Sequence, residues 1–147
     1  MSADLQAVME RLTELWNTGD AALVSEVYSE GVERSDPNQK LGRGTQEIAR
    51  YIAELRSGFP DFKLEMKRQT GDGDQVAMEW TATGTHAGTY LGIPATGRKV
   101  TMHGVTFDRI ENGKVVNERA YFDRLSLLEQ LGVAPGAAEA GAKSAAR

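Results

Sequence analysis

Near the carboxyl end of the chain, a group of polar side chains has the residue types that proton transfer requires. Arg119, Tyr121 and Asp123 alternate along a predicted strand, so they share one of its faces. An aspartate on an otherwise hydrophobic strand is costly unless it is solvated, paired or used. A carboxylate beside an imidazole forms a proton relay, because the carboxylate orients the ring and the ring titrates near neutrality. Asp123 and His103, from the preceding strand, are therefore the candidate catalytic pair.

Whether His103 meets Asp123 depends on the turn at residues 111–113. A three-residue bulged turn pairs odd-numbered residues with odd-numbered ones and places His103 beside Tyr121 and Asp123. A two-residue Asn-Gly turn pairs odd with even and places Met102 there instead. Both registers remain open from the sequence.

Each candidate also has a purely structural interpretation. Asp123 stands at a strand-to-helix junction, where it would cap the following helix. His103 would be a core or edge histidine, and His86, in a glycine-rich loop, would organise that loop through a hydrogen bond. Arg34 and Asp36 share one face of a short strand and would form a surface ion pair worth at most about 1 kcal/mol. Large residues that could line a pocket, or simply fill the core, are Trp16, Tyr28, Met66, Met78, Trp80 and Phe107.

The composition favours one ordinary globular domain. The chain has 147 residues, 40% hydrophobic and 26% charged, with a net charge of −4. This charge gives no support for binding nucleic acid or an anionic membrane, and no apolar run is long enough to span one. There is no secretory signal pattern, so a cytoplasmic location is expected. Without cysteine, and with two histidines outside any metal-binding spacing, no metal site is expected.

The elements that must position these residues follow from the apolar periodicity. Helices are predicted over residues 5–16, 21–28 and 45–57, and a short strand over 31–36. Gly19 suits the left-handed residue that ends the first helix, and Asp20 caps the second.

From Asp61 the apolar period changes to two, which indicates strands. They are predicted over 62–67, 76–81, 100–110 and 114–123, with a loop over 84–98 and a final short helix over 124–131. Three helices followed by hairpin-linked strands indicate an α+β fold. Glycines 84, 88 and 104 are candidate bend points of the sheet. Residues 133–147, rich in Ala and Gly, are predicted to be a mobile tail beyond a single domain over 1–132.

Several segments together resemble the SnoaL-like polyketide cyclase (ester cyclase) family of the nuclear-transport-factor-2-like superfamily. They are Trp-Asn-Thr-Gly-Asp at 16–20, the glycine-rich loop at 84–98, Asn-Gly-Lys-Val-Val at 112–116 and the block at 121–132. The resemblance covers about residues 4–132. It implies a cystatin-like fold, in which a curved antiparallel sheet wraps around the N-terminal helices as a cone and encloses a pocket.

The resemblance also implies a chemistry. The family's characterised cyclases close a carbon ring by an intramolecular aldol reaction, with a carboxylate as general acid and base and no metal or organic cofactor. The matching carboxylate is Asp123. Many relatives carry His-Trp where this chain has Glu118-Arg119, and Arg119 would favour the ionised form of Asp123.

On this basis we expect a small cofactor-independent enzyme that carries out an aldol-type cyclisation or an isomerisation on an apolar carbonyl compound. We also expect a homodimer formed through the outer face of the sheet. The residues expected to bind the substrate are Trp16, Tyr28, Arg34, Asp36, Trp80, His86, Arg119 and Tyr121.

Two alternatives remain open. Limonene-epoxide-hydrolase-type enzymes share this fold and activate water with an Asp-Arg-Asp set, which Asp36, Arg34 or Arg119, and Asp123 could supply. The other alternative is a non-catalytic module that binds a small apolar ligand or dimerises.

Overall fold

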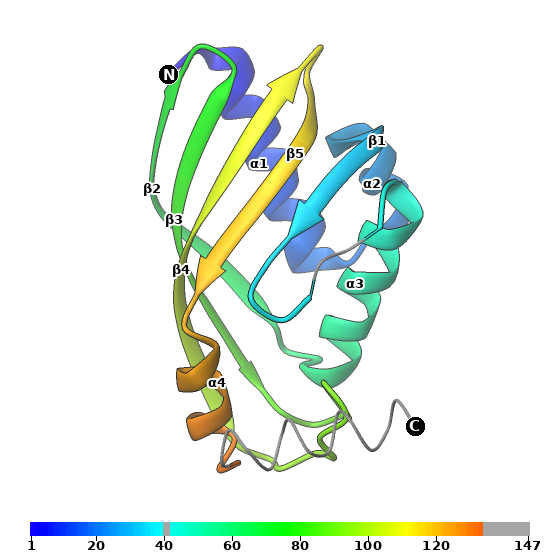
Figure 1. Ribbon diagram of the computed structural model, residues 1–147, viewed down its shortest axis with the longest axis vertical. Helices are drawn as coiled ribbons and strands as arrows, with labels where there is room; N and C mark the ends of the chain where they lie inside the picture. Colours follow the sequence, from blue (N-terminus) through cyan, green and yellow to red (C-terminus); the bar gives the residue numbers. More distant parts are fainter. Residues whose placement is uncertain (40–41, 134–147) are drawn as a thin grey trace.

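The computed structural model describes residues 1–39 and 42–133 and shows one curved sheet with helices along one face (Figure 1). The strands lie in the order β1-β5-β4-β3-β2. The elements are α1 (Ala3–Thr18), the 3-10 helix η1 (Ala21–Leu23), α2 (Val24–Val27), β1 (Tyr28–Ser35), α3 (Thr45–Gly58), β2 (Lys63–Asp72), β3 (Gln75–Thr85), β4 (Lys99–Glu111), β5 (Lys114–Phe122) and α4 (Arg124–Gln130). The predicted α+β cone fold is thus confirmed.

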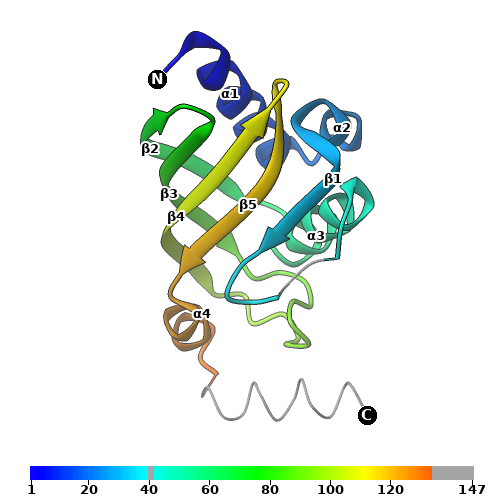
Figure 2. The same ribbon diagram turned by 45° about the horizontal axis from the view of Figure 1, so that its top comes forward.

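The helices cover the concave side of the sheet. α1 crosses behind β4 and β5, while α2 and α3 lie beside β1 (Figures 1 and 2). α4 follows β5 at the end of the sheet where the 86–98 loop also lies. This arrangement leaves the opposite face of the sheet without a covering helix from the described part of the chain.

The first strand differs from the prediction. β1 pairs with β5 in parallel, whereas the other neighbouring strands are antiparallel. The predicted helix over 21–28 is also shorter, because Tyr28 already belongs to β1. β1 therefore brings residues from the N-terminal half of the chain directly beside β5.

Both ends of α1 are capped, and the stop at Gly19 is the one predicted from the sequence. Ser2 accepts a hydrogen bond from the backbone N–H of Leu5, and Gly19 ends the helix with φ of 68°. Asn17 then fastens the helix to β2, since its side-chain amide donates to the carbonyl of Leu64 (2.9 Å) and accepts from the N–H of Leu64 (2.6 Å). These two hydrogen bonds fix the position of the C-terminal end of α1 relative to β2.

The turn between β4 and β5 decides which residues face the helices. Asn112 and Gly113 both have positive φ (51° and 73°), as a two-residue hairpin turn of this kind requires. A bulge between Arg109 and Ile110 then shifts the pairing by one residue, so that odd-numbered residues of β4 face odd-numbered residues of β5. The pairing predicted for the bulged turn is therefore present, although the bulge lies in β4 rather than in the turn.

Even-numbered residues of these two strands form the buried face. They include Met102, Thr106, Asp108, Ile110, Glu118 and Ala120. The odd-numbered residues His103, Phe107, Arg109, Arg119 and Tyr121 are exposed on the other face.

Gly104 allows an aromatic ring to pack closely against the middle of the sheet. A Cβ atom at this position would come within 2.3 Å of the ring of Trp80. The predicted importance of Gly104 thus comes from close packing against Trp80 rather than from its backbone angles. Trp80 is thereby positioned on the wall of the cavity described below.

Most of the predicted tail lies outside the described residues. Val133 belongs to the described part, and its N–H donates to the carbonyl of Leu128 (2.9 Å). None of the helices in the described ranges is long and apolar enough to cross a membrane.

Candidate active site

A cavity of about 110 Å³ lies between the buried face of the sheet, α1, α3 and the 86–98 loop. Most of its wall is apolar, with contributions from Leu12, Leu64, Met78, Ala82, Phe122 and Leu127. A small set of polar side chains interrupts this wall, and it includes Arg34, Asn38, Tyr51, Tyr90 and Glu118. A mostly apolar cavity with a few convergent polar groups is the usual form of a small-molecule site.

Arg34 and Glu118 form a buried ion pair on the wall of this cavity. β1 and β5 are paired so that Arg34 lies opposite Glu118, and Arg34 Nε donates to Glu118 Oε1 (2.8 Å). Arg34 Nη1 donates to Asp36 Oδ2 (2.6 Å). The side chains of Arg34, Glu118 and Asp36 are 6%, 2% and 0% exposed. The surface ion pair considered from the sequence for Arg34 and Asp36 is thus wrong, because both groups are buried.

Tyr28 binds the same carboxylate oxygen as Arg34. Its hydroxyl donates to Glu118 Oε1 (2.9 Å) and accepts from Trp16 Nε1 (3.0 Å). Burial, with the charge of Glu118 as a second cause, raises the pKa of Tyr28 well above its ordinary value. The hydroxyl therefore stays protonated and keeps Glu118 oriented.

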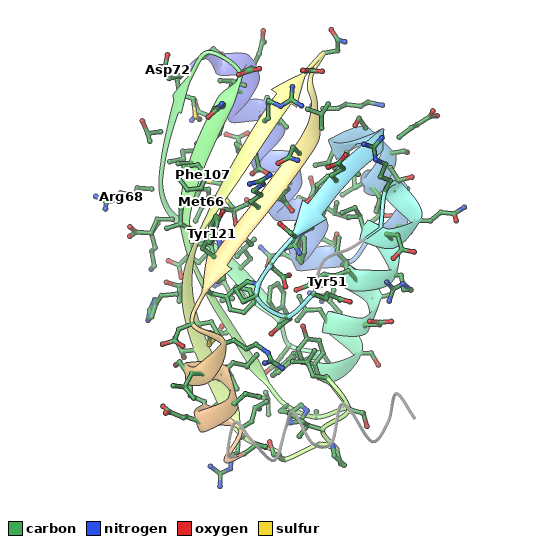
Figure 3. All side chains as sticks on the ribbon, viewed as in Figure 1. Tyr51, Met66, Arg68, Asp72, Phe107 and Tyr121 are labelled. Carbon is green, nitrogen blue, oxygen red and sulfur yellow. The ribbon has the colours of Figure 1, made fainter. Side chains whose placement is uncertain are left out.

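Two further tyrosines extend the polar cluster. Tyr51 reaches from α3 towards the segment after β1 (Figure 3), where its hydroxyl donates to Asp36 Oδ2. The guanidinium of Arg34 lies 4.5 Å from the ring centroid of Tyr51 and 5.0 Å from that of Trp16. Tyr90 Oη accepts a hydrogen bond from Asn38 Nδ2 (3.4 Å). The Tyr90 hydroxyl also lies within hydrogen-bond reach of the Tyr51 hydroxyl, so the two tyrosines form one polar group on the cavity wall.

The predicted binding residues fall into three groups. Trp16, Arg34 and Trp80 line the cavity. Tyr28 and Asp36 stand behind it, where Tyr28 holds Glu118, and Asp36 binds Arg34 and Tyr51. The third group, His86, Arg119 and Tyr121, lies away from the cavity wall.

His86 organises the loop rather than the cavity. It is fully buried, its Nδ1 accepts from the N–H of Thr96 (3.2 Å), and its ring packs 5.4 Å from that of Phe59. Burial lowers the pKa of His86, so its neutral form is favoured. This position matches the structural interpretation given from the sequence.

The remaining predicted residues lie outside the cavity. Asp123 is exposed and caps α4 by accepting from the N–H of Ser126 (3.1 Å). His103 is exposed and contacts Thr81 Oγ1 through Nδ1 (3.1 Å). Arg119 and Tyr121 are exposed on the same outer face. The expectation that these residues face the pocket is wrong, because the sheet buries its even-numbered residues.

Phe107, expected in the core or on the pocket wall, is also on the outer face. It is 50% exposed and stacks edge-on with Tyr121, whose exposed fraction is 54% (Figure 3).

Glu118 was missed by reasoning from the sequence, although a signal for it exists. Val100, Met102 and Ile110 are apolar and even-numbered, which sets the buried face of β4. With odd-to-odd pairing, that phase places Glu118 inside. The aromatic residues Phe107 and Tyr121 obscured it because they suggest the opposite face.

A further buried carboxyl group lies beside Glu118. Asp108 is directly opposite Glu118 across β4 and β5, and each residue is 2% exposed. Within the described ranges, both Asp108 oxygens and Glu118 Oε2 have no hydrogen-bond donor. Burial, with Glu118 as the second cause, raises the pKa of Asp108 well above its ordinary value.

The fold and the cavity together define a class: a cone-shaped α+β protein with an apolar interior and an internal carboxylate. A family model for the SnoaL-like polyketide cyclases matches residues 6–131. The chain therefore belongs to the SnoaL-like polyketide cyclase family.

Named relatives fit this assignment. The aklanonic acid methyl ester cyclase DnrD of Streptomyces peucetius is 30% identical over 138 residues, covering 90% of this chain and 92% of that protein. The cyclase of the same name, DauD, from Streptomyces sp. strain C5 is 29% identical over 131 residues, covering 85% and 80%. The structure of TsrD from Streptomyces laurentii superposes with a TM-score of 0.82 at 27% identity, covering 91% of this chain and 98% of that one.

Proposed function

We propose that this protein is a cyclase that closes a carbon ring by an intramolecular aldol reaction, without a metal or organic cofactor, and that Glu118 is its general base. The observation that carries the proposal is a carboxylate on the wall of a mostly apolar cavity, held by Arg34 and Tyr28. An apolar site strengthens every electrostatic interaction made inside it.

In the proposed reaction Glu118 removes a proton from a carbon next to a carbonyl group. The electron pair of that C–H bond forms the enolate, and negative charge develops on the carbonyl oxygen. The enolate carbon then bonds to a second carbonyl carbon of the same molecule, whose π electrons move to its oxygen. The proton on Glu118 returns to that oxygen, so the product is an isomer of the substrate.

Two donors on the cavity wall are suited to the developing negative charge. Arg34 uses Nε for Glu118 and Nη1 for Asp36, and its Nη2 has no acceptor among the described residues. The second is Tyr90, whose hydroxyl group lies on the cavity wall. Preorganised donors of this kind contribute roughly 3–4 kcal/mol to transition-state stabilisation.

The proposed substrate is an apolar carbonyl compound with an acidic C–H, of the polyketide methyl ester type that the names of the two curated relatives indicate. The cavity wall supports this choice, because its apolar part would hold rings and its polar cluster would hold carbonyl oxygens.

An isotope experiment tests the reaction type. Aromatic polyketide methyl esters with a 1,3-dicarbonyl side chain are incubated with the protein in deuterated water and in ¹⁸O-labelled water. In ¹⁸O-labelled water we expect an unlabelled ring product with the mass of the substrate, because aldol closure adds no water. In deuterated water we expect reversible enolate formation to exchange the C–H next to the carbonyl faster with the protein than without it. Addition of one labelled water to an epoxide substrate, with no carbon-bound deuterium from any ester, would instead support an epoxide hydrolase.

We also propose that the protein forms a homodimer through the uncovered face of the sheet. The pair of exposed aromatic rings, Phe107 and Tyr121, supports this proposal, since their centroids are 6.3 Å apart and both are half exposed. Replacing both with glutamate should convert a dimer into a monomer in light scattering after gel filtration. Leu125→Glu, at an exposed apolar residue on α4, is the matched control and should leave the dimer intact. A monomeric wild-type protein would contradict the proposal.

A further inference from the structure

The carboxyl groups of Asp108 and Glu118 are neighbours on the buried face of the sheet, away from solvent. They lie directly opposite each other in the pairing of β4 with β5, and both side chains point to the buried face. On the other side of Asp108, the pairing of β3 with β4 places the apolar residue Val76. Two ionised carboxylates in such a place would repel each other and lack hydration.

The hydrogen bonds show where one proton is needed. Glu118 Oε1 already accepts from Tyr28 and Arg34, whereas Glu118 Oε2 accepts from no described residue. Both oxygens of Asp108 are equally without a donor in the described chain. A proton on Asp108 would turn one of these oxygens into a donor, and Glu118 Oε2 is the unpaired acceptor opposite it.

No other charged or titratable group near Asp108 and Glu118 in the described chain fills the place of the missing proton. Glu118 from β5, and Tyr28 and Arg34 from β1, are the charged or titratable groups that act on Asp108. The buried residues of α1 (Val8, Met9, Leu12, Leu15 and Trp16) and of β3 (Val76, Met78 and Trp80) carry no acidic or basic side chain. Arg34 and Tyr28 both donate to Glu118 Oε1, and no described residue donates to Glu118 Oε2 or to either oxygen of Asp108.

We propose that Asp108 is a protonated acid at neutral pH that donates a hydrogen bond to Glu118 Oε2, and that it acts as a positioning residue for Glu118. This inference rests on the proposed role of Glu118 where it concerns catalysis, but the protonation of Asp108 stands independently of it. Asp108 does not line the cavity, so a substrate held there would not contact it. It acts by fixing the carboxylate of Glu118, which lies on the cavity wall.

Unfolding experiments test the protonation without any substrate. Because burial raises the pKa of Asp108 in the folded state, the unfolded chain loses this proton at a lower pH than the folded chain. The group therefore costs no stability below about pH 4, the ordinary range of an aspartate, and costs progressively more as the pH rises from there towards the folded-state pKa. Asn at this position carries an amide N–H donor that does not titrate, so Asp108→Asn removes this pH-dependent cost.

We expect the melting temperature of Asp108→Asn to exceed that of the wild type at about pH 7 and to converge with it near about pH 4. Asp72→Asn, at an exposed aspartate at the end of β2 (Figure 3), is the matched control and should show no such divergence. The ¹³C chemical shift of the Asp108 carboxyl carbon should match a protonated acid at neutral pH. An ionised shift, or an Asp108→Asn protein less stable than the wild type at neutral pH, would overturn the assignment.

Activity measurements test the positioning role separately. We expect the wild type to show an alkaline decline of kcat as Asp108 ionises, and Asp108→Asn to lack this decline while retaining kcat within a few-fold. Asp108→Leu, which fills the space without a donor, should lower kcat at least tenfold with little change in KM. If both variants keep wild-type kcat and an unchanged pH profile, Asp108 does not position Glu118. If no variant affects turnover, Glu118→Gln included, the proposed function itself fails. The ¹³C chemical shift of the Asp108 carboxyl carbon would still decide whether Asp108 is protonated.

Discussion

Replacing Glu118 by glutamine should lower kcat by about 10²–10⁴-fold, because a general base of this kind contributes that much to proton transfer. The glutamine amide cannot take up the carbon-bound proton, whereas its oxygen can still accept hydrogen bonds from Tyr28 and Arg34. KM should change little, since the apolar wall that binds the substrate is untouched. Steady-state kinetics, with a thermal melt to show that the variant is folded, provide the measurement.

Asp123→Asn is the informative control for this experiment. Asn caps helices as well as Asp does, so α4 should keep its cap while the carboxylate is lost. We expect near-wild-type turnover, because Asp123 is exposed and lies outside the cavity. A large loss of activity in Asp123→Asn, with Glu118→Gln active, would restore the residue that the family resemblance indicated and would remove Glu118 from the mechanism.

The second large effect concerns stability. Arg34→Met should lower the free energy of unfolding by about 3–5 kcal/mol, because removing one partner of a buried ion pair leaves an uncompensated buried charge. Here two carboxylates, Glu118 and Asp36, lose the same cation. Denaturant unfolding monitored by tryptophan fluorescence and circular dichroism measures the change.

An exposed arginine provides the matched control. Arg50 pairs with Glu47 and Glu54 on α3, and its side chain is 47% exposed. Arg50→Met should therefore cost at most about 1 kcal/mol. Adding Glu118→Gln to Arg34→Met should recover part of the lost stability, because the two sites share one interaction. Equal small losses for Arg34→Met and Arg50→Met would show that the buried cluster contributes little.

The sequence predicts the fold well because its local signals agree. Helical periodicity, the stop at Gly19 and the alternation from Asp61 onward each appear in the structure as α1, its cap and the sheet. The parallel pairing of β1 with β5 could not be predicted in this way, because it joins residues 84 positions apart with no local signature. That pairing is what brings Arg34 to Glu118.

The candidate site was harder to predict than the fold because a strand places alternate residues on opposite faces. Choosing the wrong phase for β4 and β5 moves every candidate from one face to the other. Phe107 and Tyr121 favoured the wrong phase, since large aromatic residues usually lie inside. The bulge at Arg109, which restores odd-to-odd pairing after a two-residue turn, has no sequence signal of its own.

A crystal structure of Glu118→Gln with a bound polyketide methyl ester tests the central claim most directly, because the variant should hold its substrate unreacted. We expect the ester within the cavity, with its acidic carbon about 3–3.5 Å from the side chain at position 118 and a carbonyl oxygen facing Arg34 or Tyr90. Binding of the ester on the outer face near Asp123, with the cavity empty, would contradict the account.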